Sequence, residues 1–199
     1  MKKLLISGFE PFLGHKVNPT KKIVEALDGR TIGEFEITAV VLPVEFDQSA
    51  KALLEHVENH NPDVVISLGL AAGRHLITPE RIAINCNDGD KDNKGYVPQD
   101  EPINEGGPDA YLSTLPIRRF VERLKEEGYP AEISNTAGTY LCNNVMYNVL
   151  DYIASGNKDM RSGFIHIPAS FDLMLTNPKL PGWSNRDLLF AVELMIEEL

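Results

Sequence analysis

The chain has 199 residues, enough for one sizeable hydrophobic core and few for two, so its length predicts a single domain over residues 1–199. Hydrophobic residues make up 43% and charged residues 24%, which is typical of a globular protein and excludes a membrane-dominated or disordered chain. The formal net charge of -10 argues against nucleic acid as a partner, because phosphate binding needs clustered Lys and Arg.

The N-terminal stretch MKKLLISGFEPF places two lysines before an apolar run, as a signal peptide does. The run breaks at Gly8, Glu10 and Pro11, which is too early for a signal peptide, and no A-x-A cleavage site follows. No other segment is long enough for a transmembrane helix, so we expect no membrane association. The two cysteines, Cys86 and Cys142, lie far apart in sequence, which favours a reducing cytoplasm over a disulfide-bonded secreted fold.

The first half of the chain alternates strand and helix signals. Residues 2–8 predict a buried strand, because four apolar or small residues in a row stop at a glycine. A helix is predicted from Asn18 as N-cap, with Pro19 at the first helical position and Gly29 just beyond the end. The next predicted elements are a strand at 35–44, a helix at 46–60 and a strand at 62–70.

The same alternation continues through the second half of the chain. The elements predicted there are a strand at 81–86, a helix at 115–128, a strand at 131–135, a helix after Thr139, a strand at 163–168 and a helix at 184–199. Strands that alternate with helices of this length predict an α/β fold, a three-layer α/β/α sandwich. Its central sheet is expected to be mainly parallel, with right-handed crossovers.

A long segment at 87–109, rich in Gly, Pro, Asp and Asn, interrupts the alternation. A loop of this length inside a compact domain either flanks a site as a flap or is an ordinary surface excursion, and the sequence favours neither. Asp88, Asp90 and Asp92 imitate the first ligand positions of an EF-hand loop. The Gly and Glu that the motif needs further on are missing, so we expect no metal site.

Cys142 begins an apolar stripe at helical spacing, and a buried core thiol is therefore one interpretation. A nucleophile is the other, because Cys142 falls in the first turn of its predicted helix, with Thr139 as the expected N-cap. Unpaired N–H groups and the positive end of the helix dipole stabilise a thiolate there. The preceding strand would place the thiol at the carboxyl end of the sheet, where open α/β folds bind ligands. Cys86 is interpreted as a core residue.

His166 and Glu80 are candidate partners for that thiol. His166 lies in the apolar strand GFIHIP, where a polar side chain must find a hydrogen bond or incur a desolvation cost. It is either a hydrogen-bonded core histidine or a base for Cys142. Glu80 stands at the head of the apolar segment TPERIAIN, where it either orients the imidazole or pairs with Arg81 as a strand-end charge.

Taken jointly, these segments resemble the pyroglutamyl peptidase family of cysteine peptidases. GLAAGRHLITPERIAIN is similar to the family signature around its glutamate, SNTAGTYLCN to the signature around its cysteine, and GFIHIP to the histidine region. GFEPFLGHKVNP near the N-terminus and the segment at 107–117 are similar as well. The resemblance spans residues 4–168, with several motifs in the family's order.

The resemblance implies an α/β fold and the removal of an N-terminal pyroglutamyl residue from peptides. By the same resemblance Cys142 is the nucleophile, His166 is the general base and then the acid, and Glu80 orients the imidazole. It implies no metal and no organic cofactor. Members of the pyroglutamyl peptidase family are commonly homo-oligomers and typically tetramers, so we expect this chain to form a homo-oligomer. The expected substrates are N-terminally pyroglutamylated peptides.

The resemblance also implies a pocket for the pyroglutamyl ring, with Phe9 and Phe12 as its walls and Asn18 as a polar contact. This ring is a neutral lactam, so apolar walls with a few amide partners would accept it. The same walls would leave the charge of a free N-terminal Glu or Gln without a partner. Alternatively, the two phenylalanines are loop aromatics that cover the core.

One segment departs from the family pattern. Family members usually carry an Arg ten residues after the glutamate, in a segment that lines the active site, and here Asp90 stands at that position. Lys91 follows it, but an ammonium lacks the planar fork of a guanidinium. This departure leaves two alternatives open: a related cysteine hydrolase that acts on another small acyl amide, or a non-catalytic relative.

Overall fold

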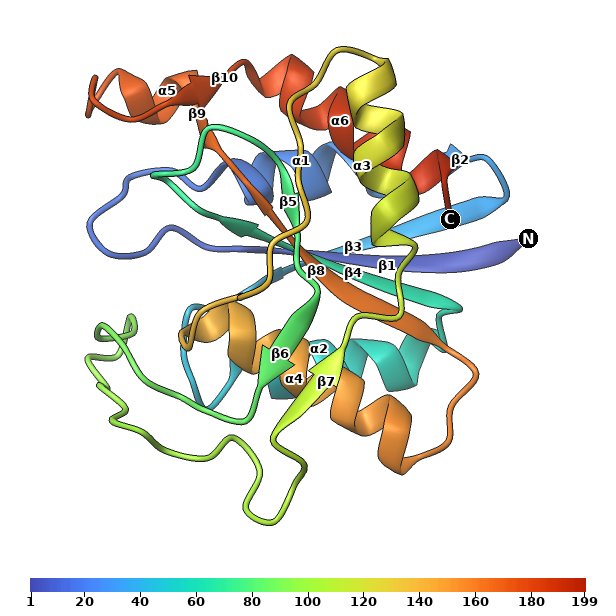
Figure 1. Cartoon of the computed structure of the whole chain (residues 1–199), viewed down its shortest axis with the longest axis vertical. Helices are drawn as coiled ribbons and strands as arrows, with labels where there is room; N and C mark the ends of the chain where they lie inside the picture. Colours follow the sequence, from blue (N-terminus) through green and yellow to red (C-terminus); the bar gives the residue numbers. More distant parts are fainter.

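The computed structural model describes residues 1–199 and has a six-stranded sheet at its centre (Figure 1). Its strands are β1 (Lys2–Phe9), β2 (Thr31–Ile32), β3 (Phe35–Leu42), β4 (Val64–Leu70), β5 (Thr78–Pro79) and β8 (Arg161–Ile167). They lie in the order β2-β3-β1-β4-β8-β5, and the four central strands are parallel. The short edge strands β2 and β5 are antiparallel to their neighbours. The predicted α/β fold with a mainly parallel sheet is confirmed.

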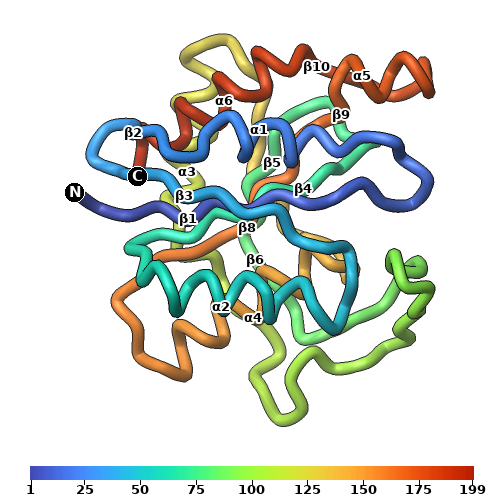
Figure 2. Tube along the Cα trace, turned by 180° about the vertical axis from the view of Figure 1, so that it is seen from behind, coloured from blue at the N-terminus to red at the C-terminus, as the bar shows by residue number.

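Helices cover both faces of this sheet (Figures 1 and 2). One face carries α1 (Pro19–Leu27), α3 (Ile117–Glu126) and α6 (Asn185–Glu197), and the other carries α2 (Ser49–His60) and α4 (Leu141–Ser155). Because strand side chains alternate, Leu4 and Ile6 pack into the first layer, whereas Leu5 and Phe9 pack into the second. The remaining helix, the single turn α5 (Phe171–Met174), lies at the edge of the molecule (Figure 1). None of the helices combines the length and apolar character needed to cross a membrane.

The start of α1 shows how the sequence signals become structure. Asn18 has an extended backbone, and its side chain accepts a hydrogen bond from the backbone N–H of Thr20, as an N-cap does. Pro19 follows at the first helical position, and Gly29, two residues beyond the helix end, has a φ of +71°. The predicted boundaries of this helix are therefore confirmed.

Two predicted strands differ from the structure. The segment at 81–86 contains β6 (Ile82–Ile84), but β6 pairs with β7 (Ala110–Leu112) in a separate antiparallel sheet and not with the central one. The predicted strand at 131–135 is wrong, because only single bridges form at Ala131 and Ser134. Its neighbour contains Pro79, which has no N–H to donate, so the parallel ladder between the segments is broken at its middle.

Candidate active site

The candidate residues meet at the carboxyl end of the parallel strands. β4 and β8 are in register so that Gly69 lies opposite His166, close to the end of both strands. Strand alternation directs Phe164 and His166 toward the layer that contains α4, and Cys142 lies in the first turn of that helix. A strand and a helix far apart in sequence thus bring the imidazole and the thiol to one place.

Gly69 leaves the space that the thiol occupies. A Cβ atom on Gly69 would lie 3.0 Å from the Cys142 Sγ and 2.5 Å from the ring of Phe164. Contacts this short require the neighbouring atoms to move, and the packed strand offers them little room. Any larger residue at this position would therefore force the Phe164 ring, the Cys142 sulfur or both to move.

Glu80 holds the imidazole from its other side. Its carboxylate is fully buried, and Oε1 lies 2.7 Å from Nδ1 of His166. The backbone N–H of Glu80 donates to the Phe164 carbonyl at 2.9 Å, which fixes the carboxylate beside β8. With Nδ1 engaged by the carboxylate, the second ring nitrogen is the one left for Cys142. The structure thus brings all three predicted catalytic residues together.

The surroundings of His166 determine its protonation. Burial alone would lower the pKa of the ring, because a charged imidazolium loses its water. The charge and hydrogen bonding of Cys142, followed by those of Glu80, outweigh burial and raise the pKa of His166 to about 9. The protonated form of the His166 ring, which lies between Glu80 and Cys142, is therefore favoured at neutral pH.

The start of α4 differs from the prediction. The helix begins at Leu141 with Tyr140 as its N-cap residue, and no side chain caps it. The predicted cap, Thr139, instead donates its hydroxyl proton to the carbonyl of Asp88, 2.8 Å away. Thr139 is one residue too early to cap and is engaged by the neighbouring loop. The N–H groups of the first turn, including that of Cys142, are left without a side-chain acceptor.

The segment at 87–109 runs between β6 and β7 and is attached to the start of α4. The backbone N–H of Asp88 donates to the carbonyl of Thr139 at 2.9 Å, and the Tyr140 hydroxyl donates to the carbonyl of Lys91 at 3.0 Å. The segment therefore flanks the site, as one of the two interpretations expected. That it moves as a flap stays a prediction.

An apolar pocket adjoins Cys142, and seven of its eight lining residues are hydrophobic. All three predicted pocket residues line it: Phe9, Phe12 and Asn18. Phe9 is buried and packs against Phe164 at a ring distance of 6.2 Å, so it covers the core as well as the pocket. Phe12 is only half-buried and stacks on Tyr140, with ring centroids 6.3 Å apart.

Asn18 has little hydrogen-bonding capacity left for a ligand. Its Oδ1 accepts from both the backbone N–H and the hydroxyl of Thr20, at 3.1 and 2.8 Å. Its Nδ2 donates to the Glu10 carbonyl at 3.1 Å. One amide hydrogen remains, so Asn18 can offer a single donor to a bound group.

The residues at the position of the family's arginine lie at the surface. Asp90 and Lys91 are exposed, and Lys91 forms no ion pair.

Burial, with smaller contributions from Asp92, Cys142 and Asp90, raises the pKa of Tyr140 to about 12. Tyr140 is therefore a neutral hydrogen-bond donor in the wall of the apolar pocket beside Cys142, which we call the thiol pocket.

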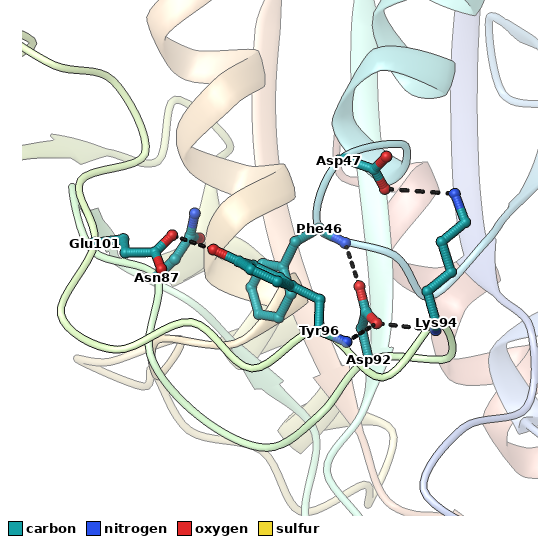
Figure 3. A pocket seen from close by; sticks show the side chains of 7 residues that line it. All are labelled: Phe46, Asp47, Asn87, Asp92, Lys94, Tyr96 and Glu101. Carbon is teal, nitrogen blue, oxygen red and sulfur yellow. Dashed lines mark hydrogen bonds and ion pairs between the residues drawn. The ribbon is translucent and has the colours of Figure 1, made fainter.

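A second cavity of about 410 Å³ lies beside the thiol pocket (Figure 3). The Phe46 ring lines this cavity and packs edge-on against Tyr140, which lines the thiol pocket, with centroids 5.2 Å apart. Asp92 faces the cavity but is engaged by the backbone N–H groups of Phe46, Lys94 and Tyr96 (Figure 3). These bonds hold the segment at 92–96 against the residues that precede α2.

Arg74 is the residue of the site that the sequence analysis did not single out. Its Nη1 lies 2.7 Å from Oε1 of Glu80, the oxygen that also contacts His166. The alternative pairing of Glu80 with Arg81 does not form, because Arg81 turns outward and donates to Asn135 at 2.7 Å. Arg74 lies within a segment that resembles the family, but a separation of six residues across a turn predicts no contact.

Cys86, interpreted from the sequence as a core residue, is only half-buried. Burial and the nearby charges of Asp100 and Asp88 raise the pKa of this thiol. The raised pKa leaves less of Cys86 as the reactive thiolate at neutral pH. No group of three or more His, Cys, Asp or Glu side chains comes together in a way that could hold a metal ion.

Comparison with known proteins shows which family the chain resembles. The family model described as pyroglutamyl peptidase matches residues 2–199. The pyrrolidone-carboxylate peptidase of Lysinibacillus sphaericus is 60% identical over 198 residues, covering 100% of this chain and 97% of that protein. That of Halalkalibacterium halodurans is 54% identical over 197 residues, covering 98% of each chain. The crystal structure of pyrrolidone carboxyl peptidase from Pyrococcus furiosus superposes with a TM-score of 0.95 at 43% identity, covering 98% of this chain and 97% of that one. The chain therefore belongs to the pyroglutamyl peptidase family.

Proposed function

We propose that the protein is a cysteine peptidase that removes the N-terminal pyroglutamyl residue from peptides. The observation that carries this proposal is the buried Glu80–His166 hydrogen bond of 2.7 Å beside Cys142, at the start of a helix and next to an apolar pocket. In this proposal Cys142 is the nucleophile, His166 the general base and acid, and Glu80 the residue that orients the ring. The sequence identity to pyrrolidone-carboxylate peptidases favours it over the two alternatives.

The proposed reaction proceeds through an acyl-enzyme. The Cys142 thiolate attacks the pyroglutamyl carbonyl carbon, and the carbonyl oxygen becomes an oxyanion. The uncapped N–H groups at the start of α4 are the candidate donors to that oxyanion. The His166 imidazolium then gives its proton to the departing amine, and the C–N bond breaks. A water molecule gives one proton to His166, and the resulting hydroxide hydrolyses the thioester, which releases pyroglutamic acid and regenerates the Cys142 thiolate and the His166 imidazolium.

The apolar pocket predicts selectivity for the uncharged lactam. We expect a fluorogenic pyroglutamyl amide to be hydrolysed under reducing conditions, with a kcat/KM at least about 100-fold above that of the glutaminyl or glutamyl amide. The reason is that a free α-ammonium group would lose its water among walls that are almost entirely hydrophobic. A prolyl amide serves as the size-matched control. If the pyroglutamyl amide were not cleaved, the proposed function would be wrong.

The raised pKa of His166 predicts how activity depends on pH. Below pH 9 the ring is protonated and can supply the proton to the leaving amine, and above it the proton is lost. We therefore expect kcat/KM to fall on the basic side with an apparent midpoint near 9. Replacing Glu80 by Gln removes one of the charges that raise this pKa, so the basic limb should move to lower pH. That variant should keep more activity than a variant of Cys142 or His166.

The proposed setting of this activity is the cytoplasm, and the proposed assembly is a homo-oligomer, by resemblance a tetramer. The location is supported by two cysteines that are free and far apart in sequence. Its substrates in this proposal are N-terminally pyroglutamylated peptides. Size-exclusion chromatography with light scattering measures the assembly directly, and a monomer at micromolar concentration would rule out a stable tetramer.

A further inference from the structure

The buried carboxylate of Glu80 receives all its hydrogen bonds at one oxygen. Oε1 contacts Nδ1 of His166 and Nη1 of Arg74, each at 2.7 Å. Oε2 is buried and has no hydrogen-bond partner. The negative charge of a residue with no exposed surface thus depends on two cationic groups, of which only one is a permanent cation.

Arg74 contacts Glu80 without lining the pocket beside Cys142. It lies in the turn after β4, where its backbone N–H donates to the Ala71 carbonyl at 2.9 Å. Its Nη1 also donates to the Thr78 hydroxyl at 2.5 Å, and its Nη2 to the Thr136 carbonyl at 3.4 Å. The Arg74 side chain is 32% exposed and lines an open pocket that shares no residue with the pocket beside Cys142. Arg74 therefore does not line the pocket proposed for the pyroglutamyl ring.

The charges around Glu80 define what Arg74 can do. His166 faces the carboxylate from β8, with Cys142 beyond the ring, and Arg74 faces it from the turn after β4. Arg81 points away toward Asn135, and the other charged groups near Arg74, Glu132 and His75, line its outer pocket. Within the proposed reaction His166 gives up its proton at the leaving amine. At that moment Arg74 is the only cation in contact with Glu80.

An isolated buried carboxylate is costly and avoids the cost by taking up a proton. A protonated Glu80 would no longer attract the imidazolium, and the ring would lose the partner that orients it. We propose that Arg74 is a positioning residue that keeps Glu80 ionised while His166 passes through its neutral state. This inference rests on the proposed function and assigns a role within it to a residue outside the triad.

The test compares Arg74→Met and Arg74→Lys with Arg81→Met as the matched control. Arg81 is the neighbouring arginine on the other side of Glu80 in sequence, and its side chain donates to Asn135 and forms no hydrogen bond or ion pair with the triad. For Arg74→Met we expect kcat on a pyroglutamyl amide to fall about 10- to 100-fold, the effect of losing one hydrogen bond between charged groups. KM should stay within about twofold, because Arg74 does not line the pocket beside Cys142.

The pH profile separates positioning from simple support of the fold. In Arg74→Met the acidic limb of kcat/KM should move to higher pH, because an unpaired buried carboxylate takes up its proton more readily. Arg74→Lys should restore most of the activity and the position of the limb, and Arg81→Met should match the parent protein. A uniform loss of activity with an unmoved acidic limb would overturn the proposal and leave Arg74 as a structural clamp.

Two further measurements keep the test decisive. If Arg74→Met does not fold, Arg74→Gln keeps a donor without the charge, and a parent-like profile in that variant would overturn the proposal. Alkylation of Cys142 by iodoacetamide, followed by mass spectrometry as a function of pH, reports the thiolate without any substrate. If the parent protein failed to cleave the pyroglutamyl amide, the proposed function would fail. An alkylation profile that moved to higher pH in Arg74→Met would then still support the role of Arg74 at Glu80.

Discussion

Replacing Cys142 by serine is expected to lower kcat on a pyroglutamyl amide by about 10⁴-fold or more and to leave the fold intact. The Cys142 sulfur lies beside the His166 ring, and the N–H groups of its own helix turn have no side-chain cap. A hydroxyl group is not ionised by such partners at neutral pH, because it holds its proton far more tightly than a thiol. Steady-state kinetics and thermal unfolding of the same preparation measure the two expectations.

The second cysteine supplies the matched control for this substitution. Cys86→Ser makes the same atomic change at a half-buried thiol whose pKa is raised by burial and by Asp100 and Asp88. We expect it to keep full activity. Iodoacetamide at neutral pH should modify Cys142 much faster than Cys86, and it should do so with loss of activity. Turnover that survives Cys142→Ser but not Cys86→Ser would mean that Cys86 is the nucleophile and that the assignment to Cys142 is wrong.

Much of the fold follows from local patterns in the sequence. Apolar runs and helical spacing place the central strands and the main helices, and the capping residues at Asn18 and Gly29 give the limits of α1. The strand expected at 131–135 fails for a reason that only its neighbour reveals, because the missing hydrogen bond belongs to Pro79. Backbone pairing depends on both neighbouring segments, whereas the strand pattern of one segment says nothing about the segment beside it.

The residues of the site can be predicted from the sequence in part, as the fold can. Cys142, His166 and Glu80 can be found from motifs, since each lies in a segment that resembles the family. The contact of Arg74 with Glu80 is decided by the turn after β4, and the outward direction of Arg81 by its bond to Asn135. Adjacency in sequence made Arg81 the alternative partner of Glu80, whereas in the structure Arg74 forms that contact. A buried charge selects its partner by geometry in three dimensions, which short sequence spacing does not determine.

Replacing His166 by alanine is expected to reduce turnover by about 10³- to 10⁴-fold, because both proton transfers of the proposed reaction lose their carrier. The ring is nearly fully buried and gives Glu80 one of its two hydrogen bonds, so stability should also fall, by about 1–3 kcal/mol. His75→Ala is the control, because His75 is exposed and only its backbone carbonyl is engaged, by the indole N–H of Trp183. It should leave both quantities unchanged.

His166→Gln separates the chemical role of the ring from its structural one. A glutamine amide can donate to the Glu80 carboxylate and fill part of the cavity, but it cannot carry a proton at neutral pH. We therefore expect His166→Gln to recover some of the lost stability and none of the activity. The rate of Cys142 alkylation at neutral pH should fall in both variants, because the imidazolium that stabilises the thiolate is gone. Substantial turnover in His166→Gln would mean that the ring serves only to fill and order the site, and the base would have to be sought elsewhere.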